Sequence, residues 1–357
     1  MLLAGYIGCG NLGDDAIMLG YAEELRKHNV EARTTSGRPE ETSQVHGVSA
    51  IPRRSMAAFK EALAEVDALV FPGGSIFQDS TSVRSVFYYA NLVKLAKKAG
   101  KRVILTGQGV GPLRTGCGRS LTARAFESAD YIAVRDPASK ELLQQIGVKR
   151  PIAVTSDSAF LLEPPPMGED TAGFNVGQMR TVGVAPRPLG KGIDVVGLMG
   201  EFCRMLFQSG TMPVLISMDR EHDVALIQAI EDRAGGKIPD IRKVESPTDI
   251  QRRMARMDSV VAMRLHAGIL AATVGVPSLM LAYDPKVTAF ARSLDIGHPV
   301  SLEKLTPARL FDLYNSFAKD RSRSAAVVAQ RRDEFRQSAA LTVARVAELV
   351  NAGTRRS

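Results

Sequence analysis

The feature that most limits the folds open to this chain is a repeated unit, in which a short apolar run is followed by a glycine-rich or charged turn and then by a helix. We predict strands at residues 2–7, 68–71, 103–106 and 131–134 in the first half, and at 181–185, 212–217, 260–263 and 278–281 in the second. Strands that alternate with helices are typical of α/β domains built on a parallel sheet. Ligands of such sheets bind outside the carboxyl ends of the strands, so the turns after these runs are the candidate site.

The length and one proline run indicate two domains. A chain of 357 residues is too long for one ordinary hydrophobic core. Three consecutive prolines at 164–166 and the polar stretch after them interrupt the strand and helix pattern. We predict a Rossmann-like domain over residues 1–163, a linker over 164–178, a second Rossmann-like domain over 179–320, and a helical segment over 321–357 that packs across both. Two such domains facing each other across a cleft form a GT-B-like α/β fold.

Charge and cysteine content narrow the class of protein further. The formal net charge of +8 at pH 7 suits anionic substrates or an anionic membrane surface, and no nucleic-acid-binding motif accompanies it. The three cysteines, Cys9, Cys117 and Cys203, are scattered and lack the spacing of metal ligands, which indicates a reducing compartment. Neither a signal peptide nor a membrane-spanning segment is predicted. We therefore expect a cytoplasmic protein that does not bind nucleic acid.

Basic side chains are predicted at two neighbouring strand ends in the second half. One strand ends before Arg264, Leu265 and His266 at the start of a helix, and the next leads to Lys286. Taken singly, Arg264 is as readily explained by a structural ion pair, and His266 by a hydrogen bond at a helix start. An Arg, a His and a Lys that converge without acidic neighbours would repel one another, so their convergence favours an anionic ligand. The N–H groups of the helix start would also bind that ligand.

The first predicted strand leads into a glycine-rich turn with the spacing GxGxxG, formed by Gly8, Gly10 and Gly13. This spacing supports a dinucleotide only weakly, because no acidic residue ends the second strand at the expected position. Asp14 and Asp15 at the helix start would also repel a pyrophosphate. The two carboxylates either cap the helix or act on a sugar hydroxyl, as proton acceptor or hydrogen-bond partner.

Several segments of the chain share the motifs of one known family. They are GYIGCGNLGDDAI from Gly5, FPGGSIFQD from Phe71, TGQGVGPL from Thr106, VRDPAS from Val134, SDSAF from Ser156, MRLHAGILAA from Met263 and AYDPKV from Ala282. In this order and spacing they resemble the polysaccharide pyruvyl transferases, especially the S-layer and cell-wall-associated type. The resemblance implies transfer of pyruvate from phosphoenolpyruvate to two hydroxyls of one sugar, forming a cyclic ketal and releasing phosphate.

The resemblance also implies roles for the residues at the strand ends. Phosphoenolpyruvate carries a phosphate and a carboxylate, which call for separate cationic groups. Arg264 would bind the phosphate, and Arg135 or Lys286 the carboxylate. His266 would protonate the methylene carbon, because an imidazole titrates near neutrality. The expected base is Asp14 or Asp15, the donor site is completed by Leu265 and Ser75, and the acceptor site contains Asn11, Gly74, Gln108 and Asp157.

No metal and no cofactor beyond phosphoenolpyruvate as co-substrate is expected, since the cations can neutralise the donor. By the same resemblance, the acceptor is a sugar such as N-acetylmannosamine in a lipid-linked or polymeric cell-wall precursor. A lipid-linked acceptor would bring the basic C-terminal helix to the anionic inner face of the cell membrane.

Two other functions fit the same pattern. A GT-B glycosyltransferase or epimerase would use Arg264 and His266 on the diphosphate of a nucleotide sugar. A non-catalytic anion-binding module would keep the site without turnover. Release of phosphate from phosphoenolpyruvate separates pyruvyl transfer from both.

Overall fold

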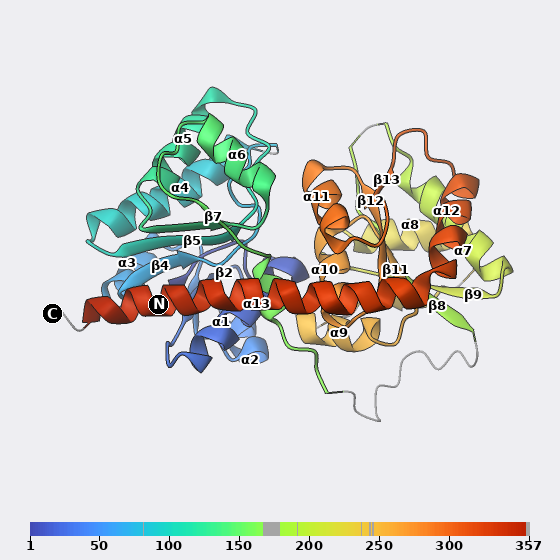
Figure 1. Ribbon diagram of the computed structural model, residues 1–357, viewed down its shortest axis with the longest axis horizontal. Coiled ribbons are helices and arrows are strands. Elements are labelled where there is room, and N and C mark those ends of the chain that lie inside the picture. The colour runs from blue at the N-terminus through green and yellow to red at the C-terminus, as the bar shows by residue number, and fades with distance from the viewer. Residues whose placement is uncertain are drawn as a thin grey trace. The chain divides into compact units, whose positions relative to one another are not determined.

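The computed structural model describes the whole chain except residues 81, 167–178, 191, 237, 243, 245 and 355–357. Two compact units form: Met1–Leu162 together with Glu334–Ser357, and Glu163–Asp333 (Figure 1). Most of the linker expected over 164–178 lies outside the described residues. Each unit is an α/β domain with a parallel sheet, which confirms the predicted fold class.

The first unit contains a sheet of the order β3-β2-β1-β4-β5-β6-β7, in which all pairs of strands are parallel. Its strands are β1 Leu2–Leu3, β2 Arg33–Ser36, β3 Ala50–Pro52, β4 Ala68–Phe71, β5 Arg102–Gln108, β6 Tyr131–Val134 and β7 Ala153–Val154. Its helices are α1 Leu12–Lys27, α2 Pro39–His46, α3 Met56–Ala64, α4 Val83–Lys98, α5 Gly116–Glu127, α6 Pro137–Gln145 and the 3-10 helix η1 Ser158–Leu161. Figure 1 shows α4, α5 and α6 on one side of this sheet, and α1 and α2 on the other.

Local sequence explains where the elements of the first unit begin. Ser55, Ser82 and Asp136 each accept a hydrogen bond from a backbone N–H in the first turn of the helix that follows. The core on the α4 side includes Phe77, whose ring lies edge-on at 5.0 Å from the ring of Phe126. These caps and contacts fix the loops at the carboxyl ends of the strands.

The second unit repeats the design with a sheet of the order β10-β9-β8-β11-β12-β13, again all parallel. Its strands are β8 Arg180–Ala185, β9 Thr211–Ile216, β10 Asp240–Ile241, β11 Ser259–Ala262, β12 Ser278–Ala282 and β13 Val300–Ser301. Its helices are α7 Val195–Gln208, α8 Val224–Ala234, α9 Pro247–Met254, α10 Leu265–Thr273, α11 Pro285–Leu294 and α12 Pro307–Lys319. Helix α7 packs against α8 and α12, and α10 packs against α9 and α11.

The C-terminal helix α13, Arg321–Thr354, contributes to both units. In the second unit Arg321 pairs with Asp258. In the first unit the Phe335 ring lies 4.9 Å from that of Phe160, and the hydroxyls of Thr155 and Thr342 lie 2.8 Å apart. No helix in the described part of the chain is both long and apolar enough to cross a membrane.

Asp79, in the loop after β4, holds the loop after β5 in place. Its carboxylate accepts hydrogen bonds from the backbone N–H groups of Arg114 at 2.6 Å and Thr115 at 2.8 Å, and from the Thr115 hydroxyl at 2.6 Å. Burial alone would raise the pKa of Asp79, but these donors outweigh it and the pKa lies below its usual value.

We expect Asp79→Ala to lower the free energy of unfolding at pH 7 by at least about 2 kcal/mol, because two backbone donors lose a charged acceptor. A depressed pKa stabilises the fold above the pKa of the unfolded chain, near 3.9, and this contribution is lost as the pH falls through the folded value. Urea denaturation at pH 7 and pH 3 should therefore show a smaller difference from wild type at pH 3. Asp333→Ala, with a side chain 68% exposed, is the control. Equal losses in the two variants would contradict this role of Asp79.

Candidate functional site

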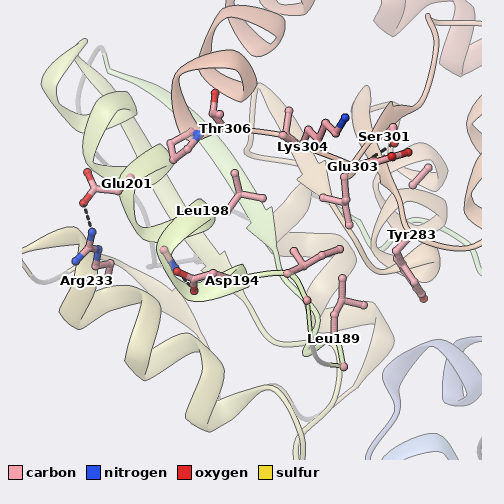
Figure 2. A pocket seen from close by; sticks show the side chains of 18 residues that line it. Leu189, Asp194, Leu198, Glu201, Arg233, Tyr283, Ser301, Glu303, Lys304 and Thr306 are labelled. Carbon is pink, nitrogen blue, oxygen red and sulfur yellow. Dashed lines mark hydrogen bonds and ion pairs between the residues drawn. The ribbon is translucent and has the colours of Figure 1, made fainter.

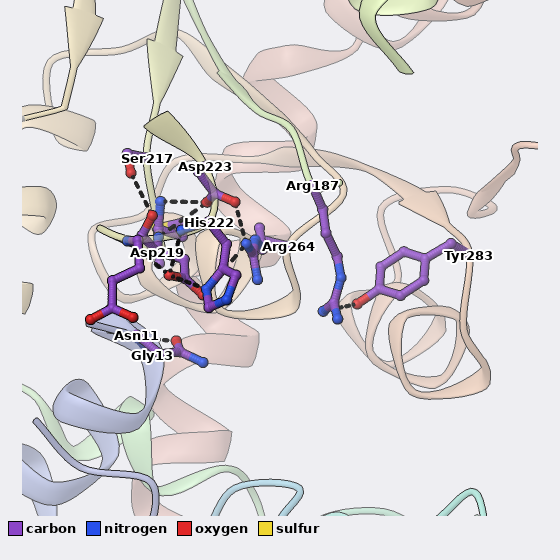
Figure 3. A network of polar contacts seen from close by, with 11 residues as sticks. Asn11, Gly13, Arg187, Ser217, Asp219, His222, Asp223, Arg264 and Tyr283 are labelled. Atoms are coloured by element: carbon purple, nitrogen blue, oxygen red, sulfur yellow. Dashed lines mark hydrogen bonds and ion pairs between the residues drawn. The ribbon is translucent and has the colours of Figure 1, made fainter. Parts of the chain in front are cut away.

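Adjacent parallel strands bring basic side chains to one edge of the second sheet. Strand β11 pairs with β8 on one side and β12 on the other, so their carboxyl ends share an edge. Arg187 follows β8, Arg264 follows β11, and Tyr283 follows β12 (Figure 3). His266 also follows β11, two positions after Arg264. These residues therefore follow neighbouring strands at one edge of the sheet, and their binding of a ligand stays a prediction.

Arg264 has acidic neighbours, which corrects the expectation that the cations converge without them. Its guanidinium donates a hydrogen bond to Asp223 and lies 3.8 Å from Asp219 (Figure 3). The Arg264 side chain is only 12% exposed and that of Asp223 is fully buried. Both acids lie in the turn between β9 and α8, far along the chain from Arg264. The pair fixes the direction of the guanidinium, whose Nε is buried without a hydrogen-bond partner among the described residues.

The two acids differ in environment. Burial raises the pKa of Asp223, and the opposing effects of Arg264 and of the Met218 N–H do not fully offset it. Burial also acts on Asp219, but hydrogen bonds from His222 and the charge of Arg264 outweigh it and lower the pKa. His222 Nδ1 lies 2.9 Å from the Asp219 carboxylate. Arg264 is thus held by one ionised carboxylate and one that is costly to ionise.

Arg187 is a site residue that our sequence reasoning did not select. Its Nη1 donates to the Tyr283 hydroxyl at 2.7 Å, and its Cζ lies 4.9 Å from the centre of that ring. Burial raises the pKa of Tyr283 against the opposing charges of Arg187 and Arg264, so the phenol stays protonated at neutral pH. Within the described residues no carboxylate lies at ion-pair distance from Arg187. Arg187 lies between Pro186 and Pro188 directly after a strand, and this position in the sequence could have marked it as a candidate.

The remaining predicted donor residues lie at two helix starts. Leu265 and His266 are the first residues of α10, with Leu265 buried and His266 half-buried. Lys286 lies in the first turn of α11, where its backbone N–H donates to Asp284 at 3.0 Å and its Nζ lies 3.7 Å from the same carboxylate. Lys286 therefore also has an acidic neighbour.

A pocket of about 910 Å³ adjoins Tyr283 within the second unit (Figure 2). Apolar side chains such as Leu198 and Leu302 line it together with charged ones. Among the latter, Glu201 pairs with Arg233 at 3.1 Å. Tyr283 thus lines this pocket and also contacts Arg187.

At the glycine-rich turn of the first unit, the two carboxylates have different positions. Asp15 is 7% exposed and accepts the Gly8 N–H at 2.7 Å. Asp14 is half-buried and lies against Gly74, where a Cβ atom would be 3.0 Å from its Oδ1. Asn11 caps α1 by accepting the Gly13 N–H at 3.0 Å. Asp15 therefore shapes the turn from inside, whereas Asp14 lies at the glycine-lined edge.

Four other predicted residues form hydrogen bonds inside the first unit. Arg135 donates to Asp157 at 2.6 Å and to Ser75 Oγ at 2.8 Å, and the side chains of Arg135 and Asp157 are 6% and 4% exposed. Gln108 is fully buried and donates to the carbonyls of Phe71 at 3.1 Å and Thr106 at 3.0 Å. Arg135 is thus paired with Asp157 inside the first unit, and its binding of the donor carboxylate stays a prediction.

We expect Arg135→Ala to destabilise the fold by about 3 to 5 kcal/mol, because it leaves the buried Asp157 carboxylate without its cation. The double variant Arg135→Leu/Asp157→Leu, which removes both charges, should recover most of this loss. Thermal unfolding measures both. If Arg135→Ala unfolds like wild type but binds phosphoenolpyruvate more weakly, Arg135 is a ligand-binding group after all.

Among the described residues, no group of three or more His, Cys, Asp or Glu side chains is placed to hold a metal ion. The arrangement in the second unit instead offers guanidinium groups, a phenol and an imidazole at one sheet edge. Such a set can bind an oxyanion and deliver a proton.

Solved structures with the same architecture define the class of fold as GT-B-like. HepE from Anabaena, solved in complex with UDP-glucose, has a TM-score of 0.61 at 13% identity, covering 99% of both chains. A putative UDP-N-acetylglucosamine 2-epimerase from Listeria monocytogenes has a TM-score of 0.66 at 16% identity, covering 95% of this chain and 93% of that one. The UDP-GlcNAc 2-epimerase from Neisseria meningitidis, solved with UDP-GlcNAc, has a TM-score of 0.59 at 12% identity, covering 98% and 100%.

Sequence comparison then gives the family. Residues 11–285 match the family model for polysaccharide pyruvyl transferase. The chain belongs to the polysaccharide pyruvyl transferase family, as its motifs indicated. No curated protein matches the sequence.

Proposed function

We propose that the protein transfers pyruvate from phosphoenolpyruvate to two hydroxyls of one sugar, as a cyclic ketal, and releases phosphate. The observation that carries the proposal is the group formed by Arg187, Arg264 and Tyr283 at adjacent strand ends, in a member of this family. Phosphoenolpyruvate is a compact ligand with two anionic groups, and this edge supplies separate cations for them.

The donor roles follow from how each cation is held. Arg264 is fixed by Asp223, so its guanidinium presents a defined direction, and we assign it to the phosphate. Lys286 remains a candidate to bind the carboxylate of phosphoenolpyruvate. Arg187, whose described contacts are to Tyr283, is a second candidate for this role. We propose a structural role for Arg135, because it forms a buried pair with Asp157.

Ketal formation needs a balanced set of proton transfers. The methylene carbon gains one proton, both acceptor hydroxyls lose theirs as the two C–O bonds form, and the phosphate leaves with its bridging oxygen and the second proton. We assign His266 as the acid for the methylene carbon. Of the two candidate bases, Asp14 suits the task better, because the Asp15 carboxylate is buried and accepts the Gly8 N–H. We propose no metal and no further cofactor.

The acceptor is proposed to be a sugar, in keeping with the family and with structural neighbours solved with UDP-sugars. N-acetylmannosamine of a lipid-linked or polymeric cell-wall precursor is the acceptor that the sequence resemblance suggests. A lipid-linked acceptor would place the reaction at the inner face of the cell membrane.

Incubation with phosphoenolpyruvate and a panel of sugars, sugar phosphates and nucleotide sugars tests the proposal. Phosphate release and the mass of the acceptor are read together, and the product should gain the mass of pyruvic acid less one water. Without use of phosphoenolpyruvate, release of a nucleoside diphosphate from a nucleotide sugar would indicate a glycosyltransferase, and conversion of the nucleotide sugar to an isomer of the same mass would indicate an epimerase. Binding without turnover of any donor would indicate a non-catalytic module.

A further inference from the structure

Arg53 is a half-buried cation at the carboxyl end of β3 that the proposed reaction has not used. Its Cζ lies 5.0 Å from the ring centre of Tyr88, 5.1 Å from that of Tyr6 and 5.8 Å from that of Tyr89. Nη2 donates to the Tyr89 hydroxyl at 3.2 Å, and Nη1 lies 3.9 Å from Cys9 Sγ. In the described part of the chain, Nε is buried without a hydrogen-bond partner and no carboxylate pairs with the guanidinium.

This environment leaves the charge of Arg53 without a counter-ion. Two other arginines with little exposure have one, since Arg135 pairs with Asp157, and Arg242 with Glu231. The tyrosine rings attract the guanidinium through cation–π contacts, but they are neutral groups. Burial raises the pKa values of Tyr88 and Tyr89, so neither becomes a phenolate near neutral pH. A partly desolvated cation without an anion is suited to accept one from a ligand.

The position of Arg53 is fixed from both sides of its backbone. Its N–H donates to the carbonyl of Ser36 at 2.8 Å, and the Tyr88 hydroxyl donates to its carbonyl at 2.6 Å. Tyr89 is 1% exposed, whereas Tyr6 is 38% exposed, so the ring cluster opens to solvent on the side of Tyr6. The guanidinium is thus held in place before any ligand arrives, which lowers the entropic cost of binding.

Arg53 also belongs to the same sheet edge as Asp14. Burial and, to a smaller extent, the charge of Asp14 raise the pKa of Tyr89, the ring that Arg53 contacts. At the glycine-rich turn, the Gly8 N–H that could bind a phosphate is taken by Asp15. A phosphate at this edge therefore needs a different hydrogen-bond donor, and the Arg53 guanidinium is placed to supply one.

We propose that Arg53 is the anion-recognition residue of the acceptor site, and that it binds a phosphate group attached to the acceptor sugar. This inference rests on the proposed function, in which Asp14 acts on the acceptor hydroxyl. A sugar joined to a phosphate presents both groups that the edge requires, a hydroxyl for Asp14 and an anion for Arg53. The phosphate can come from a nucleotide or from a lipid diphosphate.

Titration calorimetry with inorganic pyrophosphate tests the site without using phosphoenolpyruvate. The background is the full-length double variant Arg264→Gln/Asp223→Asn, in which the arginine of the donor site is removed. Added to this background, Arg53→Gln is expected to weaken pyrophosphate binding at least about tenfold, the effect of losing one charged hydrogen bond. Arg54→Gln is the matched control, because it removes the same charge from the next, exposed residue. Equal effects of the two variants, or no binding in the background, would overturn the proposal.

Arg53→Lys covers the case in which Arg53→Gln fails to fold, since Lys keeps the charge and the ring contacts. It should bind pyrophosphate several-fold more weakly, because an ammonium lacks the paired N–H donors. Unchanged affinity in Arg53→Lys, or stronger binding of glucuronate than of pyrophosphate, would overturn the phosphate assignment. Uridine diphosphate and farnesyl diphosphate in detergent micelles then identify the source of the phosphate. The source is the one of the two that binds more tightly and depends on Arg53 for its affinity. Failure of the proposed function would show separately, as absence of phosphate release from phosphoenolpyruvate.

Discussion

Replacing His266 with glutamine is expected to lower turnover with phosphoenolpyruvate by about a hundredfold to ten-thousandfold, the usual contribution of general acid catalysis. Glutamine keeps a hydrogen-bond donor at the second position of α10 but cannot deliver a proton to the methylene carbon. His266 is half-buried at this helix start, so the substitution should leave the fold and most of the donor affinity intact. Steady-state kinetics of phosphate release, with KM and kcat separated, measures the effect.

The pH profile adds a readout that a structural role would not change. A reaction that needs a protonated acid slows at high pH, and this limb of the profile should disappear in the residual activity of His266→Gln. His298→Gln serves as the control, because His298 is an exposed histidine of the same unit. A variant that loses affinity for the donor, yet reaches the wild-type rate at saturation, would make His266 a binding group and leave Asp14 as the next candidate acid.

Replacing Arg264 with alanine is expected to affect both the donor and the fold. Loss of a charged hydrogen bond to phosphate costs about 1.5 to 3 kcal/mol, and more where the site is desolvated, so affinity for phosphoenolpyruvate should fall at least about tenfold. The substitution also leaves the fully buried Asp223 carboxylate without its cation. Breaking a buried pair in this way costs about 3 to 5 kcal/mol of stability.

The double variant Arg264→Gln/Asp223→Asn separates the two effects. It removes both charges and leaves two amides able to hydrogen-bond, so thermal stability should return most of the way to wild type while donor affinity stays low. Arg264→Lys should keep more stability than alanine but bind the donor more weakly than arginine, since it lacks the paired donors. Recovery of donor affinity in the double variant would show that Arg264 acts only by holding Asp223 and the turn before α8.

The positions of the candidate residues along the chain could be predicted from sequence. Short apolar runs mark the buried strands, and in parallel sheets the residues after such runs meet at one edge. This reasoning placed Arg264, His266 and Lys286 after two neighbouring strands, as the structure has them. It also placed two Rossmann-like domains and, through the motifs, the family.

What each side chain is bound to was decided only by the tertiary structure. Arg264 was expected to have no acidic neighbour, yet Asp223 lies 41 positions away in the chain and beside it in space. Arg135 was expected to face a ligand, and it is buried against Asp157. Arg187 and Arg53 drew no attention, because their tyrosine partners lie 96 and about 36 positions away. The local sequence pattern specifies where strands and helices begin and end. Ion pairs and ring contacts depend on the order of strands in the sheet and on the packing of the loops, and residues distant in sequence determine both of these together.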